Sequence, residues 1–234
     1  MKKKIILLFI LVSSVINGQI KIPDNFSKSV IPEYQSEFWR KLNFSLNEYA
    51  VENRNNEIYV YLTGQQHKTS LAIKGGTLIA INHGEFGGEL KFLSKEKTHK
   101  QILIKKGNIK FLFEYKNRIF FIDALAHMST RRGIMYELKQ KKNQFEYIEV
   151  INLEDAPSAM EIINDKILFA SHENFYVVDN FKKKELFKNK FWRGLYPNSI
   201  AFFDWKNIFV GIRGGIVKLN VLENKINLYT EKEF

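Results

Sequence analysis

Three side chains that can carry a positive charge, His83, His172 and Arg213, follow β-like runs of the sequence. Each lies five residues after the first residue of its run, and those first residues are Leu78, Ile167 and Ile208. Imidazole and guanidinium groups bind carboxylates, sulfates and phosphates, and imidazole can also bind zinc or transfer a proton. The equal offset predicts that the three side chains come together on one side of the fold.

Other polar side chains fall in connections of the same kind. The candidate ligand-binding residues are His83, Glu85, His127, Arg131, Arg132, His172, Arg193, Tyr196 and Arg213. His67 falls in a similar connection, whereas His99 is expected on the opposite side. We therefore expect a polar, basic surface, which we call the His/Arg-rich face.

Catalysis and metal binding have to be weighed for the same residues. Glu85, Asp123, Asp155 and Glu173 could supply the carboxylate pair of a glycosidase, but the neighbouring strands are mostly apolar. The sequence has no Gly-x-Ser-x-Gly motif, no cysteine nucleophile and no closely spaced pair of histidines. We expect no metal and no other cofactor, and we favour binding without catalysis. The alternative is a small secreted enzyme of hydrolase or cyclase type that uses the same face.

Charge and composition limit the partners. The 234 residues include 36 Lys and Arg against 25 Asp and Glu, for a net charge of +11. Basic clusters at residues 105–106, 139–142 and 182–184 are far apart, whereas nucleic-acid-binding proteins more often concentrate them in one stripe. We therefore expect no nucleic acid, and a protein or an anionic glycan as partner. Because the chain has no Cys, its fold must depend on the core alone.

The first 19 residues have the pattern of a signal peptide. Lys2, Lys3 and Lys4 precede an apolar run of twelve residues, and a short polar stretch with Gly18 follows. The alternative, a membrane anchor, needs about 20 apolar residues. We predict a secreted or periplasmic protein with no lipid-bearing cysteine and no membrane span in the mature chain. Cleavage would remove three lysines and no acid, which lowers the net charge from +11 to +8.

The rest of the sequence predicts an all-β fold built from a repeated unit. Four strands begin at Leu78, Ile119, Ile167 and Ile208, so the spacings are 41, 48 and 41 residues. A strand and a turn precede each of them, and a third strand, a lysine-rich turn and a fourth strand follow. The clearest internal match is between residues 157–170 and 197–210. A short helix over residues 36–43 is the only one expected after the signal peptide.

A four-stranded antiparallel unit of about forty residues resembles the blade of a β-propeller. The resemblance covers residues 69–234 as four blades, and it rests on period and pattern because no Trp-Asp or kelch motif is present. It implies a β-propeller of five four-stranded blades, in which residues 20–68 form an irregular N-terminal blade or a segment that closes the ring. The alternative is an all-β sandwich or an open barrel.

In a β-propeller the connections that hold the candidate residues share one face, the usual ligand surface. The longest connection, residues 123–133, would either contact a partner or fold down to plug the central channel. Residues 192–197 would either form a binding hot spot with Trp192, Arg193 and Tyr196 or close a blade interface. We therefore predict an exported, monomeric, non-catalytic β-propeller that binds a protein or an anionic ligand through its His/Arg-rich face.

Overall fold

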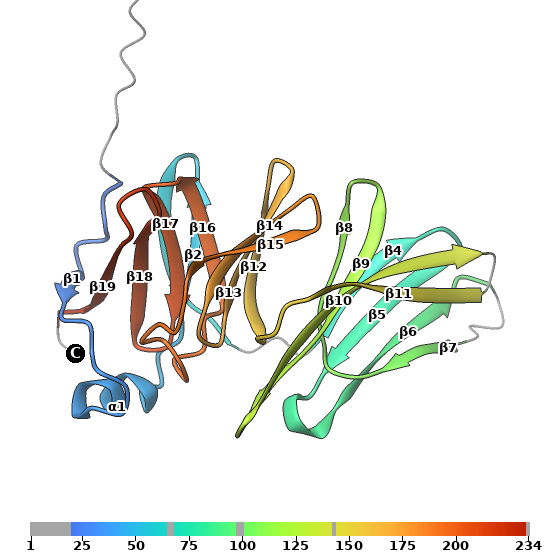
Figure 1. Cartoon of the computed structure of the whole chain (residues 1–234), viewed down its shortest axis with the longest axis horizontal. Coiled ribbons are helices and arrows are strands. Elements are labelled where there is room, and N and C mark those ends of the chain that lie inside the picture. Colours follow the sequence, from blue (N-terminus) through green and yellow to red (C-terminus); the bar gives the residue numbers. More distant parts are fainter. Residues whose placement is uncertain (1–19, 65–67, 97–100, 142–143, 233–234) are drawn as a thin grey trace, which may run out of the picture.

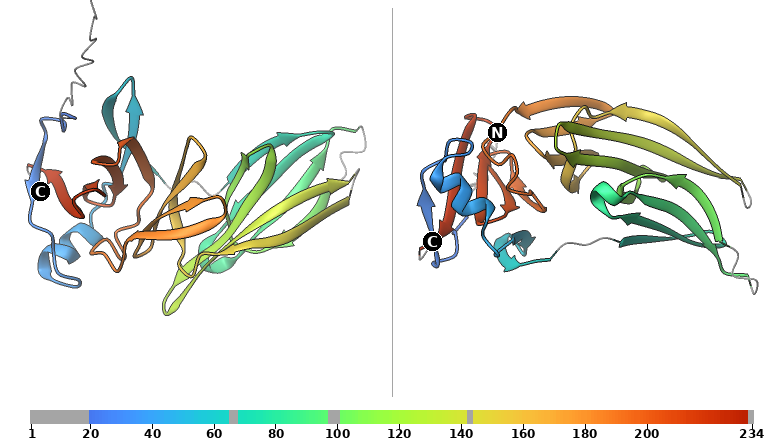
Figure 2. Two further views of the ribbon diagram at one scale, coloured as in Figure 1. Left: turned by 45° about the horizontal axis from the view of Figure 1, so that its top comes forward. Right: turned by 90° about the horizontal axis from the view of Figure 1, so that it is seen from below.

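The computed structural model describes residues 20–64, 68–96, 101–141 and 144–232. Antiparallel strands dominate these residues, so the predicted all-β class is confirmed. The strands form five sheets that follow one another along a curved row (Figure 1, Figure 2). The predicted signal peptide, His67 and His99 lie outside the described residues.

Three of the sheets are four-stranded meanders whose strands lie in chain order. The first contains β4 (Lys68–Ile73), β5 (Gly76–Asn82), β6 (Gly88–Ser94) and β7 (Gln101–Lys106), with the 3-10 helix η1 (Gly84–Phe86) between β5 and β6. The second contains β8 (Ile109–Tyr115), β9 (Arg118–His127), β10 (Thr130–Lys141) and β11 (Gln144–Asn152). The third contains β12 (Pro157–Ile163), β13 (Lys166–Ser171), β14 (Phe175–Asp179) and β15 (Lys182–Phe187).

The other two sheets involve the N-terminal region. The fourth sheet contains β16 (Ser199–Asp204), β17 (Asn207–Ile212), β18 (Gly215–Asn220) and β19 (Lys225–Glu231), and β1 (Phe26–Ser29) pairs with β19 as a fifth strand. The fifth sheet is a hairpin of two strands, β2 (Tyr49–Arg54) and β3 (Glu57–Leu62).

The described helix α1 (Glu37–Asn43) agrees with the short helix predicted from the sequence. Ser36 is its N-cap, and the Ser36 hydroxyl accepts a hydrogen bond of 3.2 Å from the Trp39 amide. Trp39 is buried, and its indole N–H donates to the carbonyl oxygens of Phe191 and Arg193, both at 3.1 Å. The helix is thereby attached to the segment that connects β15 to β16. Among the described residues, no helix is long and apolar enough to cross a membrane.

Tight turns join the strands because the residues in them tolerate left-handed backbone conformations. In the β2–β3 turn both Asn55 and Asn56 have positive φ angles, 53° and 66°, as a type I′ turn requires. The β8–β9 turn has the same pattern at Lys116 and Asn117, with φ angles of 49° and 57°. These turns bring consecutive strands into antiparallel pairs, which explains why the meanders were predictable.

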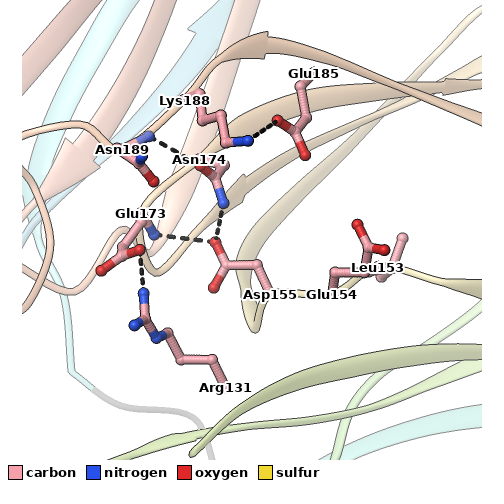
Figure 3. A pocket seen from close by; sticks show the side chains of 9 residues that line it. All are labelled: Arg131, Leu153, Glu154, Asp155, Glu173, Asn174, Glu185, Lys188 and Asn189. Atoms are coloured by element: carbon pink, nitrogen blue, oxygen red, sulfur yellow. Dashed lines mark hydrogen bonds and ion pairs between the residues drawn. The ribbon is translucent and has the colours of Figure 1, made fainter. Parts of the chain in front are cut away.

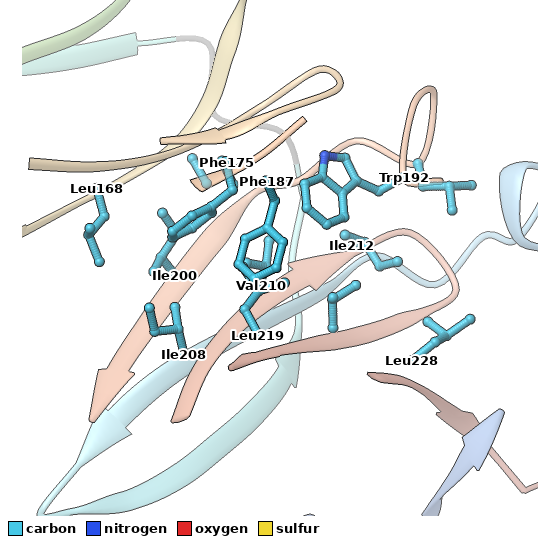
Figure 4. Close-up of a cluster of buried hydrophobic side chains, with 14 of the residues drawn as sticks. Leu168, Phe175, Phe187, Trp192, Ile200, Ile208, Val210, Ile212, Leu219 and Leu228 are labelled. Atoms are coloured by element: carbon cyan, nitrogen blue, oxygen red, sulfur yellow. The ribbon is translucent and has the colours of Figure 1, made fainter. Parts of the chain in front are cut away.

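Hydrophobic clusters lie between successive sheets and hold the row together. Figure 4 shows one of them, in which Leu168 and Phe175 of the third sheet pack with Val210 of the fourth. Other clusters join the first sheet to the second, the second to the third, and the fourth to the β2–β3 hairpin. Trp192 is fully buried in the cluster of Figure 4, and its indole N–H donates to the Ser171 carbonyl at 3.2 Å. Of the two roles considered for Trp192, the structural one is therefore correct.

The interpretation of residues 123–133 as a long loop is wrong. β9 continues to His127 and β10 begins at Thr130, so a turn of only two residues joins them. The extra residues lengthen two paired strands because their backbone groups bond across the hairpin, with Arg131 opposite Ala126 and Gly133 opposite Ala124.

Two of the three basic clusters lie in strands, although lysine-rich turns were expected between the third and fourth strands. Lys105 and Lys106 end β7, and Lys182, Lys183 and Lys184 begin β15. Both strands are the last of their meanders.

Candidate functional site

The connections that hold several candidate residues lie along one edge of the molecule. In Figure 1, α1, η1 and the β9–β10 turn are all at the lower edge, although they are far apart in the sequence. The segment before β16 joins this edge because α1 is hydrogen-bonded to it. The candidate residues on this edge divide into several separate groups of contacts.

The first group is centred on Glu173, which two candidate arginines share. Arg193 pairs through Nε with one carboxylate oxygen at 3.0 Å, and Arg131 pairs through Nη1 with the other oxygen. The Glu173 side chain is only 11% exposed, whereas those of Arg131 and Arg193 are 32% and 39% exposed. One carboxylate thus faces two partly exposed guanidinium groups, which leaves a net positive charge.

Asp155 fixes the loop that carries Glu173. Its buried carboxylate accepts hydrogen bonds from the amide of Glu173 at 3.1 Å, the side chain of Asn174 at 2.7 Å, and the Ser171 hydroxyl. It also accepts from the Ala156 amide at 2.8 Å. Figure 3 shows the contacts of Asp155 with Glu173 and Asn174, and that of Glu173 with Arg131. With four donors, Asp155 is a structural carboxylate and is not placed to act as an acid or base.

A groove of about 520 Å³ opens beside the two arginines. Its lining residues are Tyr34, Arg131, Glu173, Asn189, Lys190, Phe191 and Arg193. The Arg193 guanidinium lies 4.9 Å from the centre of the Tyr34 ring, within the range of a cation–π contact. Three cationic side chains and one carboxylate line this groove, together with two aromatic rings and an amide.

A second hollow of about 240 Å³ lies beside Arg131 and Glu173 (Figure 3). It shares Arg131, Glu173 and Asn189 with the groove. Its other lining residues are Leu153, Glu154, Asp155, Asn174, Glu185 and Lys188. Four carboxylates and two cations give this hollow the opposite charge, so the larger groove is the better site for an anion.

His172 lies beside this group and is partly buried. Burial lowers the pKa of its imidazole below the usual 6.5, and Arg131 and Arg193 act in the same direction. The carboxylates of Asp155 and Glu173 oppose this shift. The His172 amide donates to the Ala156 carbonyl at 2.9 Å. His172 is therefore neutral at neutral pH and contributes no charge to the groove.

Arg213 forms a separate contact with Glu48. Two of its guanidinium nitrogens, Nη2 and Nε, donate to one Glu48 carboxylate oxygen at 2.5 and 3.1 Å. A third, Nη1, donates to the carbonyl of Asn43 at the end of α1 at 3.0 Å. The Tyr196 ring covers the guanidinium at 4.2 Å from its centre. Arg213 and Tyr196 are thus brought together, but the guanidinium is occupied in joining α1 and the β2–β3 hairpin to the fourth sheet.

The remaining candidates lie in two further contacts. His127 pairs through Nδ1 with Glu85 at 2.8 Å, which links the β9–β10 turn to η1. His83 is exposed at the start of η1. Arg132 pairs with the buried carboxylate of Asp123 at 3.0 Å, and Lys105 pairs with the other oxygen at 3.1 Å.

Several residues of the groove were not among the sequence candidates. Glu173 was considered only as half of a catalytic pair, and Tyr34, Asn189 and Lys190 were not considered. Tyr34 stands two residues before the helix N-cap and carries no signal of its own. Lys190 could have been suspected only from its position directly before the Phe191–Trp192–Arg193 run.

Most of the carboxylates weighed for catalysis already have partners within the chain. Within the described ranges, no group of three or more His, Asp or Glu side chains is arranged to hold a metal ion. Of the carboxylates considered for a catalytic pair, Asp123, Asp155 and Glu173 are already engaged by cations or by several hydrogen-bond donors.

No protein-family model matches the chain, and no curated protein matches it at a significant level.

Proposed function

We propose that the chain is an exported, non-catalytic binding module with a β-propeller architecture, and that it binds an anionic group of a protein or glycan. The succession of antiparallel meanders with hydrophobic clusters between them supports this architecture. In it the β2–β3 hairpin corresponds to a fifth, incomplete blade.

The observation that carries the proposed function is the sharing of Glu173 by Arg131 and Arg193 beside an open groove. Because one carboxylate neutralises only one guanidinium, the pair retains a positive charge that Lys190 increases. Guanidinium groups bind carboxylates and sulfates through directed, charge-assisted hydrogen bonds. Tyr34 and Phe191 add aromatic surface that can pack on a sugar ring or an apolar side chain.

Binding rather than catalysis is favoured by the state of the ionisable groups. A general acid or base needs a free position within hydrogen-bond distance of its substrate. Glu173 is held by two arginines, and Asp155 by four hydrogen-bond donors. These carboxylates orient the loop and the arginines, which is what a preformed binding surface requires.

The test is a titration of the chain from Ile20 onward with three anionic polymers. Polyglutamate presents carboxylates on a peptide, polygalacturonate presents them on a glycan, and heparin presents sulfates. We expect at least one polymer to bind, and the double variant R131Q/R193Q to weaken that binding about tenfold or more. The preferred polymer then distinguishes an acidic protein from a glycan.

A matched control removes the same charge elsewhere. Lys182 and Lys184 are exposed on β15, so K182Q/K184Q lowers the net charge by the same amount without touching the groove. This variant should retain the binding of the unaltered chain at physiological salt. Equal losses in both variants would show that only overall charge matters, and no binding to any polymer would overturn the proposal.

A further inference from the structure

The outer edge of the β2–β3 hairpin, formed by β3, differs from the edges that β7, β11, β15 and β1 form in the other described sheets. Sheet edges that carry charged side chains resist pairing with other strands. The last strands of the other sheets each carry charges within the strand, and these are Lys105 and Lys106 in β7, Glu146 and Glu149 in β11, Lys183 and Lys184 in β15, and Lys28 in β1. In β3 the one charged residue is Glu57 at the first position, and the five residues after it are Ile, Tyr, Val, Tyr and Leu. After its first residue, β3 itself therefore lacks the charged side chains that the other four strands carry.

The backbone hydrogen bonds show which groups of β3 point away from the hairpin. The Thr63 amide donates to the Glu48 carbonyl at 2.8 Å, so this pair is hydrogen-bonded. The Val51 amide instead donates to the Ser199 hydroxyl at 2.8 Å, away from β3. Because pairs alternate along an antiparallel ladder, Val51 and its partner Val60 form a non-hydrogen-bonded pair. The amide and carbonyl of Val60 must therefore point to the open edge.

The same alternation applies along the whole strand. Ile58 and Leu62 lie two residues on either side of Val60, so their amides and carbonyls also point outward. Tyr59 and Tyr61 bond inward to β2 instead. Among the described residues no strand pairs with β3 on this side, and Tyr59 and Leu62 are 44% and 60% exposed. The backbone amides and carbonyls of three alternate residues, Ile58, Val60 and Leu62, are thus available to another strand.

We propose that a second copy of this chain occupies the edge, with its β3 antiparallel to the first and a two-fold axis at Val60. In this register Val60 faces Val60 of the second copy, and Ile58 faces Leu62 of the second copy. The three outward amides of each copy then donate to the three outward carbonyls of the other copy. On the opposite side of the new sheet, Tyr59 lies across from Tyr61 of the second copy. The strand is self-complementary because aliphatic side chains meet aliphatic ones and aromatic rings meet aromatic rings.

The strand count supports a second copy over a single added strand. Two hairpins of two strands make one four-stranded sheet, which is the size of the three meanders β4–β7, β8–β11 and β12–β15. The proposal does not depend on the groove or on its ligand, because it uses only residues of β3, and none of them lines the groove. It departs from the monomer expected from the sequence.

The test compares two substitutions at Val60 by sedimentation velocity over a range of protein concentrations. Proline removes the outward N–H of residue 60 and leaves the inward hydrogen bonds to β2 in place. Alanine removes nearly the same side-chain packing and keeps the N–H, so V60A is the matched control. We expect the unaltered chain and V60A to dimerise and V60P to remain a monomer. A monomer at every concentration for the unaltered chain, or equal dimerisation of V60P and V60A, would overturn the proposal.

A second measurement covers the case in which V60P fails to fold. Amide hydrogen exchange of the unaltered chain is followed at low and high protein concentration. The amides of Ile58, Val60 and Leu62 should exchange more slowly at high concentration, whereas those of Tyr59 and Tyr61 should not change. Exchange at residues 58, 60 and 62 that is independent of concentration would rule out a second copy on this edge.

Discussion

Arg213 and Arg193 each pair with a glutamate in adjoining connections, but their surroundings differ. The connections touch, since the Arg213 amide donates to the Leu195 carbonyl at 2.7 Å. The side chains of Arg213 and Glu48 are 21% and 14% exposed, and the guanidinium also bonds the carbonyl that ends α1. The Arg193 side chain is 39% exposed, and it shares its glutamate with Arg131 beside the groove.

The difference shows that the number of arginines on a surface does not identify a binding site. The Arg213 contact is balanced, because one guanidinium meets one carboxylate and a carbonyl oxygen. The Glu173 contact is unbalanced, because two guanidinium groups meet one carboxylate. A balanced, covered pair joins elements of the fold, whereas an unbalanced, open one retains charge for a ligand.

The largest expected effect is on stability and comes from R213A. Removing one partner of a largely buried pair leaves Glu48 without its cation, which should cost about 3 kcal/mol in the free energy of unfolding. R193A should cost only about 1 kcal/mol, because Arg131 still pairs with Glu173. Urea unfolding of the two variants measures the difference. Equal losses would remove the distinction between the two contacts.

A smaller effect, on binding, is expected from E173Q. The amide keeps the shape of Glu173 but frees both arginines from its charge, so a bound anion gains about 1 kcal/mol, or about fivefold in affinity. Titration with the polymer that binds the unaltered chain measures this gain at low salt.

The control for this prediction is E146Q. Glu146 is exposed on β11 and lies outside the groove lining, so its loss changes the net charge alone. The affinity of E146Q should stay close to that of the unaltered chain. A weaker affinity for E173Q than for the unaltered chain would mean that Glu173 contributes to the ligand contact.

The smallest effect concerns pH and His172. Because burial lowers its folded-state pKa below 6.5, the unfolded chain binds a proton first as the pH falls. His172 therefore favours folding fully above about pH 6.5, and this contribution is lost as the pH falls toward the folded-state pKa. H172Q should lose less stability than the unaltered chain between neutral and mildly acidic pH, as measured by urea unfolding. Parallel pH profiles for the two proteins would contradict the prediction.

Local pattern was enough to predict most strands. Alternating apolar residues and turn residues such as Asn55 and Asn117 act over a few positions, so the meanders follow from the sequence. The Ser36 cap and the short helix were predictable for the same reason. The length of β9 and β10 was not, because the run around His127 carries loop-like residues and only pairing across the hairpin extends the strands.

The sequence by itself determined the all-β class, the repeated meanders and the supply of arginines in connections between strands. Only the tertiary structure decided that Glu173 meets both Arg131 and Arg193, that Glu48 pairs with Arg213, and that β3 has no second partner strand among the described residues. The physical reason is the distance along the sequence over which each kind of interaction acts. Strand and turn preferences depend on neighbouring residues, whereas ion pairing and edge exposure depend on how distant segments pack.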